Sequence, residues 1–175
     1  MLVGAAVSGW FFWLFAVALR RSVGTLSAYA IAGFFWSLVL IALVTLLPAY
    51  GDPGIVPAEG RATSCSTDIG GPAPEGFWVF AGGQRLLNTL LFVPSGVLLV
   101  LAAARWRIGW VLVPLGLAGL VAYSVAIELT QLELARLDRA CDLTDVVDNV
   151  AGAVLGVGIG LVLVLVFRPW RHRVP

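Results

Sequence analysis

Residues 146–167 read VVDNVAGAVLGVGIGLVLVLVF. Beyond Asp148 and Asn149 this stretch holds only apolar side chains and glycine. A helix of about 20 apolar residues crosses the ~30 Å hydrocarbon core of a bilayer. The stretch therefore predicts a transmembrane helix that carries two polar side chains near its beginning.

Four more apolar stretches of similar length lie upstream, at residues 2–19, 29–47, 86–104 and 109–131. Their ends are marked by polar or helix-breaking residues: Arg20 and Arg21 follow the first stretch, and Pro48 follows the second. Helices satisfy their own backbone hydrogen bonds, which is required inside lipid. We predict an all-α, polytopic bundle of five transmembrane helices that forms a single membrane domain over residues 1–175.

The composition excludes two common classes of protein. The 175 residues are 60% hydrophobic and 12% charged, and their mean hydropathy is +0.97. A soluble domain is about 25% charged, so an ordinary soluble enzyme is excluded. The formal net charge of +1 excludes a nucleic-acid-binding protein that relies on a basic face.

The arginines predict the orientation of the bundle. Seven would lie on one side of the membrane and four on the other. The seven are Arg20, Arg21, Arg105, Arg107, Arg168, Arg171 and Arg173; the four are Arg61, Arg85, Arg136 and Arg139. Because cytoplasmic loops are enriched in basic residues, we expect the C-terminus in the cytoplasm. The N-terminus and the loops 48–85 and 132–144 would then lie outside.

The two cysteines, Cys65 and Cys141, fall on the two loops that this topology places outside. An external location is oxidising, so a disulfide between them is one interpretation, and two unpaired thiols are the other. There is no CxxC motif and no Cys/His cluster. We therefore expect neither a metal site nor a cofactor.

Polar residues at membrane depth gather near the outer ends of three predicted helices. They are Asn88 in the third, Glu128 and Gln131 in the fourth, and Asp145, Asp148 and Asn149 in the fifth. Such residues are costly in lipid and mark functional sites. Structural roles are the alternative: Asp142 or Thr144 would cap the fifth helix, and Asp145 would complement its dipole. Glu128 would pair with Arg139 or Arg85. Asn88 would form an interhelical hydrogen bond.

Small residues predict close helix packing below this cluster. Gly152, Gly156 and Gly160 recur every four residues, which is typical of helices that approach closely in lipid. Asn149 lies on the same helical stripe and should point into the bundle. In the third helix, Pro94 and Gly96 free backbone carbonyls and favour a kink.

Three segments together resemble the VanZ-like family. They are NTLLFVPSG at 88–96, ELTQ at 128–131 and RACDLTDVVDNVAG at 139–152. In the last segment Arg139, Asp142, Asp145, Asn149 and Gly152 fit the family pattern, whereas Asp148 stands where an apolar residue is usual, which suggests an altered local charge. The resemblance covers about residues 84–160. It implies a helical bundle in the bacterial plasma membrane and an association with resistance to glycopeptide antibiotics, chiefly teicoplanin.

Four functions are compatible with these residues. The first is a non-catalytic envelope protein that binds a lipidated glycopeptide or a lipid-linked cell-wall precursor through Asn88, Glu128, Gln131, Arg139, Asp142, Asp145 and Asn149. The second is an intramembrane enzyme that uses the carboxylates of Glu128 and Asp145 on an envelope lipid or anchored peptide. A small transporter component and a structural subunit are the others. Membrane lipids are the expected surroundings, nucleic acid is not an expected partner, and the oligomeric state stays open.

Overall fold

The computed structural model describes residues 1–47, 64–67, 83–133 and 141–167, with the exception of the side chain of Gln84. These residues form the helices α1 (Leu2–Val23), α2 (Thr25–Leu46), α3 (Gly83–Ala103), α4 (Gly109–Glu133) and α5 (Leu143–Phe167). All five are long and apolar enough to cross a membrane. The predicted class and the number of spans are confirmed within the described part of the chain.

The connection between α1 and α2 is shorter than predicted. The sequence suggested a loop from residue 20 to residue 28, but Gly24 alone separates the two helices. Its φ of 78° and ψ of 158° lie in a region of backbone conformation that essentially only glycine adopts. Arg20 and Arg21 therefore belong to the last turn of α1, where cations interact favourably with the helix dipole.

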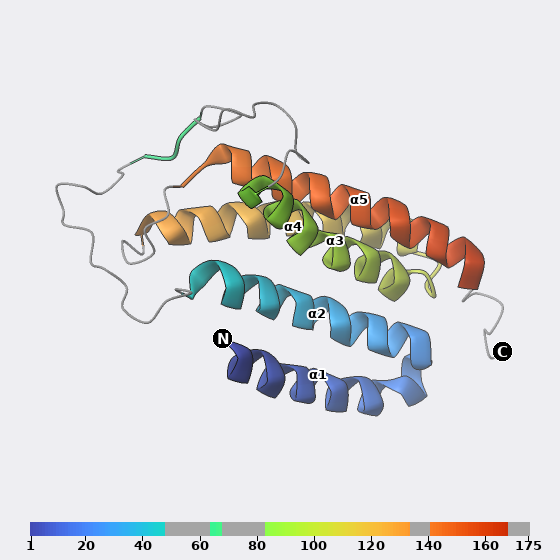
Figure 1. Ribbon diagram of the computed structural model, residues 1–175. Helices are drawn as coiled ribbons and strands as arrows, with labels where there is room; N and C mark the ends of the chain where they lie inside the picture. The colour runs from blue at the N-terminus through green and yellow to red at the C-terminus, as the bar shows by residue number, and fades with distance from the viewer. Residues whose placement is uncertain (48–63, 68–82, 134–140, 168–175) are drawn as a thin grey trace.

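The helices lie side by side along one direction, as Figure 1 shows. α1 packs on α2, α2 on α3, and α3 on α5, while α4 lies against α5, α3 and α2. We call the end where α2 and α4 finish and α3 and α5 begin the loop-side end. α3 and α5 both start there, so they run parallel.

Glycine brings α3 and α5 into backbone contact. A Cβ atom on Gly152 would overlap the carbonyl oxygen of Thr89, and one on Gly156 would overlap that of Val93. On α3, Gly96 meets the carbonyl oxygen of Ala153 in the same way. The glycine spacing predicted this close approach, and the van der Waals contact between backbones is what holds helices together in lipid.

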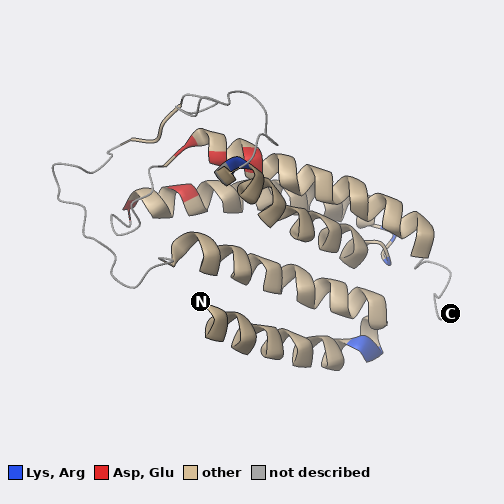
Figure 2. Ribbon diagram, in the orientation of Figure 1, with Lys and Arg blue, Asp and Glu red and all other residues tan. Residues whose placement is uncertain are grey.

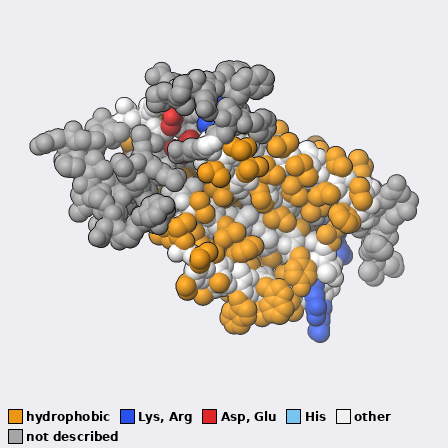
Figure 3. Space-filling view, in the orientation of Figure 1, with side chains coloured by type: hydrophobic (Ala, Val, Ile, Leu, Met, Phe, Trp, Pro, Cys, Tyr) orange, Lys and Arg blue, Asp and Glu red, His pale blue; other side chains and the backbone are white. Residues whose placement is uncertain are grey.

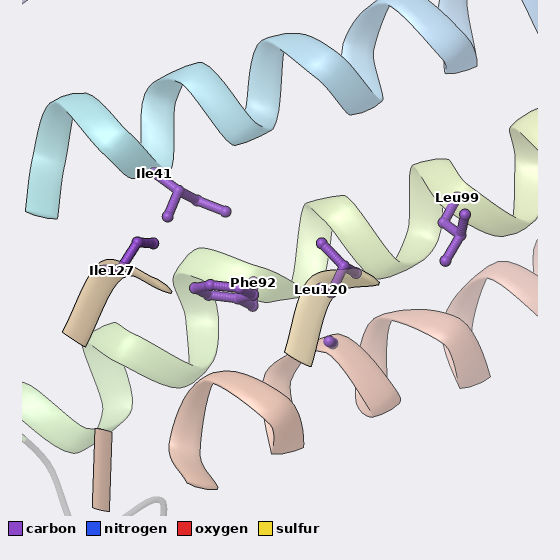
Figure 4. Packing of buried hydrophobic residues seen from close by; sticks show 6 residues of the cluster. Ile41, Phe92, Leu99, Leu120 and Ile127 are labelled. Atoms are coloured by element: carbon purple, nitrogen blue, oxygen red, sulfur yellow. The ribbon is translucent and has the colours of Figure 1, made fainter. Parts of the chain in front are cut away.

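A small hydrophobic core lies between four of the helices. It consists of Ile41 from α2, Phe92 and Leu99 from α3, Leu120 and Ile127 from α4, and Ala153 from α5. Figure 4 shows Ile41, Phe92, Leu120 and Ile127 near one another and Leu99 further along the bundle. α1 contributes none of them, and its aromatic residues Trp10, Phe11 and Trp13 are more than half exposed.

Apolar side chains also cover the outside of the bundle. The face seen in Figure 3 is hydrophobic along the helices, and exposed leucines and valines continue to the end of α5, where Leu165 and Val166 are 65% and 67% exposed. Water would solvate such a surface poorly. Lipid is therefore the medium that this surface requires.

Charge divides between the two ends of the bundle, as Figure 2 shows. The described carboxylates are at the loop-side end: Glu128, Glu133, Asp142, Asp145 and Asp148. Four of the five described arginines lie at the opposite end: Arg20, Arg21, Arg105 and Arg107. The fifth, Arg85, lies at the loop-side end with the carboxylates. This separation agrees with the expected orientation, which itself stays a prediction.

A disulfide joins Cys65 to Cys141. Of the two interpretations that the sequence left open, a disulfide and two unpaired thiols, the first is confirmed. The neighbouring backbone adds two hydrogen bonds: Ser66 N–H donates to the Cys141 carbonyl at 2.9 Å, and Leu143 N–H donates to the Ser66 carbonyl at 3.0 Å. The segment 64–67 is thereby fastened to the beginning of α5.

Gly152→Ala should destabilise the protein by about 1–3 kcal/mol, since overpacking a tight interface has this cost. The reason is that the new methyl group would collide with the backbone of Thr89. Unfolding of the purified protein by heat or by sodium dodecyl sulfate measures the change. Gly158→Ala is the matched control, because nothing lies within 4 Å of a Cβ at that position. Equal stability of the two variants would contradict the close α3–α5 contact.

A membrane-impermeant thiol reagent added to intact cells should label Cys65 and Cys141 only after reduction. The disulfide blocks both thiols, and the predicted orientation places them outside. Mass spectrometry of the labelled protein gives the result. Labelling without reduction would contradict the disulfide, and no labelling after reduction would contradict the orientation.

Candidate functional site

A buried ion pair connects α3 to α5 at the loop-side end. Arg85 donates from Nε to Asp148 Oδ2 at 2.9 Å and from Nη2 to Asp148 Oδ1 at 2.7 Å. The Asp148 side chain is completely buried, and that of Arg85 is 15% exposed. The two parallel bonds match the fork of the guanidinium to the two oxygens of the carboxylate, which is the strongest form of this interaction.

The ion pair changes the interpretation of Asp148. The sequence suggested that this residue alters the local charge, because the family pattern has an apolar residue there. In the structure Arg85 compensates the carboxylate, so the pair adds no net charge. Sequence reasoning placed both residues at this end of the bundle, but it considered Arg85 as a partner of Glu128 and did not foresee its pairing with Asp148. The available signal was one aspartate inside an apolar stretch and one arginine at the start of another.

The beginning of α5 is fixed by Asp142 and Glu128. The Asp142 carboxylate accepts a hydrogen bond from Thr144 N–H at 2.8 Å, so Asp142 caps the helix. Asp142 N–H in turn donates to Glu128 Oε2 at 3.2 Å. This cap explains why α5 begins at Leu143 rather than at residue 146, and it gives the buried Glu128 carboxylate a partner on another element.

Amide side chains connect the remaining helices. Asn149 Nδ2 donates to Ser124 Oγ at 3.0 Å, which links α5 to α4. Gln131 Nε2 donates to the Thr45 carbonyl at 3.0 Å, which links α4 to α2. Asn149 is 3% exposed, so it points into the bundle.

Two polar atoms at this end have no hydrogen-bond partner although they are buried: Asn88 Nδ2 and Asn149 Oδ1. Most buried polar groups in proteins are hydrogen-bonded, and each exception needs a reason. Together with the groups above they form what we call the polar layer. Its members are Thr45, Arg85, Asn88, Ser124, Glu128, Gln131, Asp142, Asp148 and Asn149.

The other predicted site residues are distributed as follows. Arg139 lies outside the described residues. Asp145 is partly buried in the first turn of α5, where its charge suits the helix dipole. Pro94 lies inside α3 with an exposed side chain. Gly160 continues the α3–α5 interface against Val97 and Val100.

The chemistry available in the described residues is hydrogen bonding and charge. They include no group of three or more His, Cys, Asp or Glu side chains that could hold a metal ion. Both cysteines are oxidised to the disulfide, so neither is a thiol nucleophile. The polar layer offers amide donors, amide and carboxylate acceptors, and one guanidinium that is already paired.

A family model described as VanZ/LLP1 matches residues 34–166. The chain belongs to this family. The match is longer than the three segments that carry the resemblance in sequence, because it begins inside α2 and continues almost to the end of α5. α1 precedes it, and the whole polar layer falls within it. No curated protein and no solved structure matches the chain.

Asp148→Ala should lower the free energy of unfolding of this VanZ/LLP1 protein by about 3–5 kcal/mol, because it leaves the buried guanidinium of Arg85 without its counter-ion. The double variant Arg85→Met, Asp148→Leu should be more stable than either single variant. It replaces the pair with apolar side chains, as the family pattern has at position 148. Denaturant unfolding of the purified proteins measures both effects. Additive losses in the double variant would show that the two residues do not act as a pair.

Proposed function

We propose that this VanZ/LLP1 protein binds a lipidated or lipid-linked molecule of the bacterial envelope through the polar layer, at the outer leaflet of the plasma membrane. Protection against the lipidated glycopeptide teicoplanin is the finer form of the proposal. Binding, rather than chemical conversion, is the role that the described side chains support best.

The observation that carries the proposal is the burial of charged and amide groups at membrane depth. Glu128, Gln131 and Asp148 are at most 4% exposed, and they lie within helices apolar enough to span a bilayer. A polar side chain there is unfavourable, so its presence in a span indicates function. In this chain such groups come together at one end from α3, α4 and α5, and Gln131 bonds the Thr45 carbonyl of α2.

The disulfide and the charge distribution support an outer location for this end. Disulfides persist in oxidising compartments, and the Cys65–Cys141 bond lies at the beginning of α5. The four arginines at the opposite end suit the cytoplasmic side. A ligand with a lipid tail in the outer leaflet would then bring its head group to the depth of the polar layer.

An intramembrane enzyme is the second candidate, and the buried carboxylate of Glu128 is the observation that favours it. In that case Glu128 or Asp145 would transfer a proton to or from an envelope lipid. Lipid turnover by the purified protein should then be lost in Glu128→Gln and in Asp145→Asn. Turnover that survives both substitutions would exclude this candidate.

Expression in a glycopeptide-sensitive Gram-positive host should raise the inhibitory concentration of teicoplanin but not that of vancomycin, which lacks the acyl tail. The double variant Glu128→Ala, Arg139→Ala should lose this protection. Susceptibility is compared at equal protein level, measured by immunoblot of the membranes.

Thr130→Ala is the matched control for that experiment. The Thr130 hydroxyl bonds only the carbonyl of Ala126 in its own helix, so protection should persist. Absence of protection by the wild-type chain would contradict the role in resistance. Equal protection by the double variant would contradict the role of the polar layer.

A further inference from the structure

The polar layer contains side chains whose hydrogen bonds connect the helices, and two buried side-chain atoms that have no hydrogen-bond partner. Arg85 pairs with Asp148, Gln131 with the backbone of Thr45, and Glu128 with the backbone of Asp142. The two buried atoms without a partner, Asn88 Nδ2 and Asn149 Oδ1, both belong to asparagines, and the chain contains only these two asparagines. The paired groups fix the helices relative to one another. The asparagine atoms without a partner are therefore the ones that can contact a ligand.

Asn149 points from α5 toward α4. Its Nδ2 donates to Ser124 Oγ on α4. The residue is only 3% exposed. The amide oxygen of the same group has no partner. One half of the amide therefore fixes its orientation, and the other half presents an acceptor.

Asn88 lies on the side of α3 that borders both α2 and α4. It lies one helical turn on the loop side of Phe92, and residues four apart share a helix face. The Phe92 ring is 6.4 Å from that of Tyr123 on α4, and Phe92 packs with Ile127 in the core (Figure 4). The next residue, Thr89, meets Gly152 of α5 instead. Ser95 is two turns further on and shares this face, and its Oγ lies 2.8 Å from Ser37 Oγ on α2. Asn88 Nδ2 is therefore a buried donor on the side of α3 that borders α2 and α4.

The two orphan atoms lie at similar depth. Pairs of residues across the parallel helices are separated by 63 positions, as in Arg85 with Asp148 and Thr89 with Gly152. In this register Asn88 corresponds to position 151, two residues from Asn149, which is about 3 Å along a helix. A donor on α3 and an acceptor on α5 thus lie within one turn of each other in depth.

We propose that Asn88 Nδ2 and Asn149 Oδ1 together bind a neutral group that both accepts and donates a hydrogen bond, namely an amide or a hydroxyl of the ligand's head group. This inference rests on the proposed function and specifies the chemistry of its site. An anionic group would satisfy only the donor and would lie near the Glu128 carboxylate. A cation would satisfy only the acceptor. A neutral amide or hydroxyl satisfies both.

The presence of only two asparagines makes a direct test feasible. Protein with ¹⁵N in the asparagine side chains, in lipid nanodiscs, should give two side-chain ¹⁵N signals by NMR, each correlated with two protons. Asn88→Leu assigns them by removing one ¹⁵N signal. A polyprenyl-linked muropeptide is the probe, and polyprenyl pyrophosphate, which lacks the peptide and sugar, is its control. We expect the muropeptide to shift both signals and the control lipid to shift neither. Teicoplanin is tested in the same way.

Affinity measurements by calorimetry on the same nanodiscs complete the test. Asn88→Leu should weaken muropeptide binding by about tenfold or more, as the loss of one buried hydrogen bond predicts. It should also unfold at the same or a higher temperature, since the orphan donor is gone. Thr130→Ala should bind as the wild type does.

The outcomes separate this inference from the proposed function. Two results would overturn the inference and leave the proposed function intact. One is heat of binding with no shift of either asparagine signal, and the other is unchanged affinity in Asn88→Leu. The two atoms without a partner would then bind only water. Absence of binding of both the muropeptide and teicoplanin to the wild type would overturn both. Equal shifts with polyprenyl pyrophosphate would overturn the assignment to a neutral group.

Discussion

The backbone contact between α3 and α5 is the constraint on which the rest of the structure depends. Gly152 and Gly156 let the carbonyls of Thr89 and Val93 approach α5 without an intervening side chain. In lipid, where no hydrophobic effect draws helices together, such contact supplies much of the attraction. The same register carries Arg85 to Asp148 at the loop-side end. A residue with a side chain at either glycine would separate the helices and lengthen the ion pair.

The polar layer follows from this contact. With α3 and α5 fixed in parallel, Asn149 reaches Ser124 on α4, and the capped beginning of α5 places Asp142 N–H on Glu128. The disulfide and the two backbone hydrogen bonds of Ser66 fasten the same beginning of α5 from the other side. A buried polar group is tolerated when it has partners and is costly when it lacks them. The layer is therefore rigid around two unsatisfied amide atoms, and rigidity lowers the entropic cost of binding there.

Much of the fold could be predicted from the sequence, because hydropathy reports directly on spans. The five helices, the glycine interface and the inward direction of Asn149 follow from length and period. The pairing of Arg85 with Asp148 did not follow, since residues 63 positions apart meet only once the register of α3 on α5 is known. The single-residue turn at Gly24 did not follow, because arginines after an apolar stretch mark the edge of the membrane but do not show whether the helix continues through them. The sequence did not decide whether Asp142 caps α5 or contacts a ligand. The hydrogen bond from Thr144 N–H to the Asp142 carboxylate shows that Asp142 caps the helix.

The central claim is that the loop-side polar layer binds a head group through Asn88 and Asn149 while the ion pair remains closed. The most direct measurement is a cryo-electron microscopy structure of the full chain in nanodiscs, enlarged by a bound antibody fragment, with the polyprenyl-linked muropeptide present. The account predicts head-group density within hydrogen-bond distance of both asparagines and an intact Arg85–Asp148 pair. Density at the arginine-rich end instead, or a broken ion pair with the asparagines still unoccupied, would contradict it.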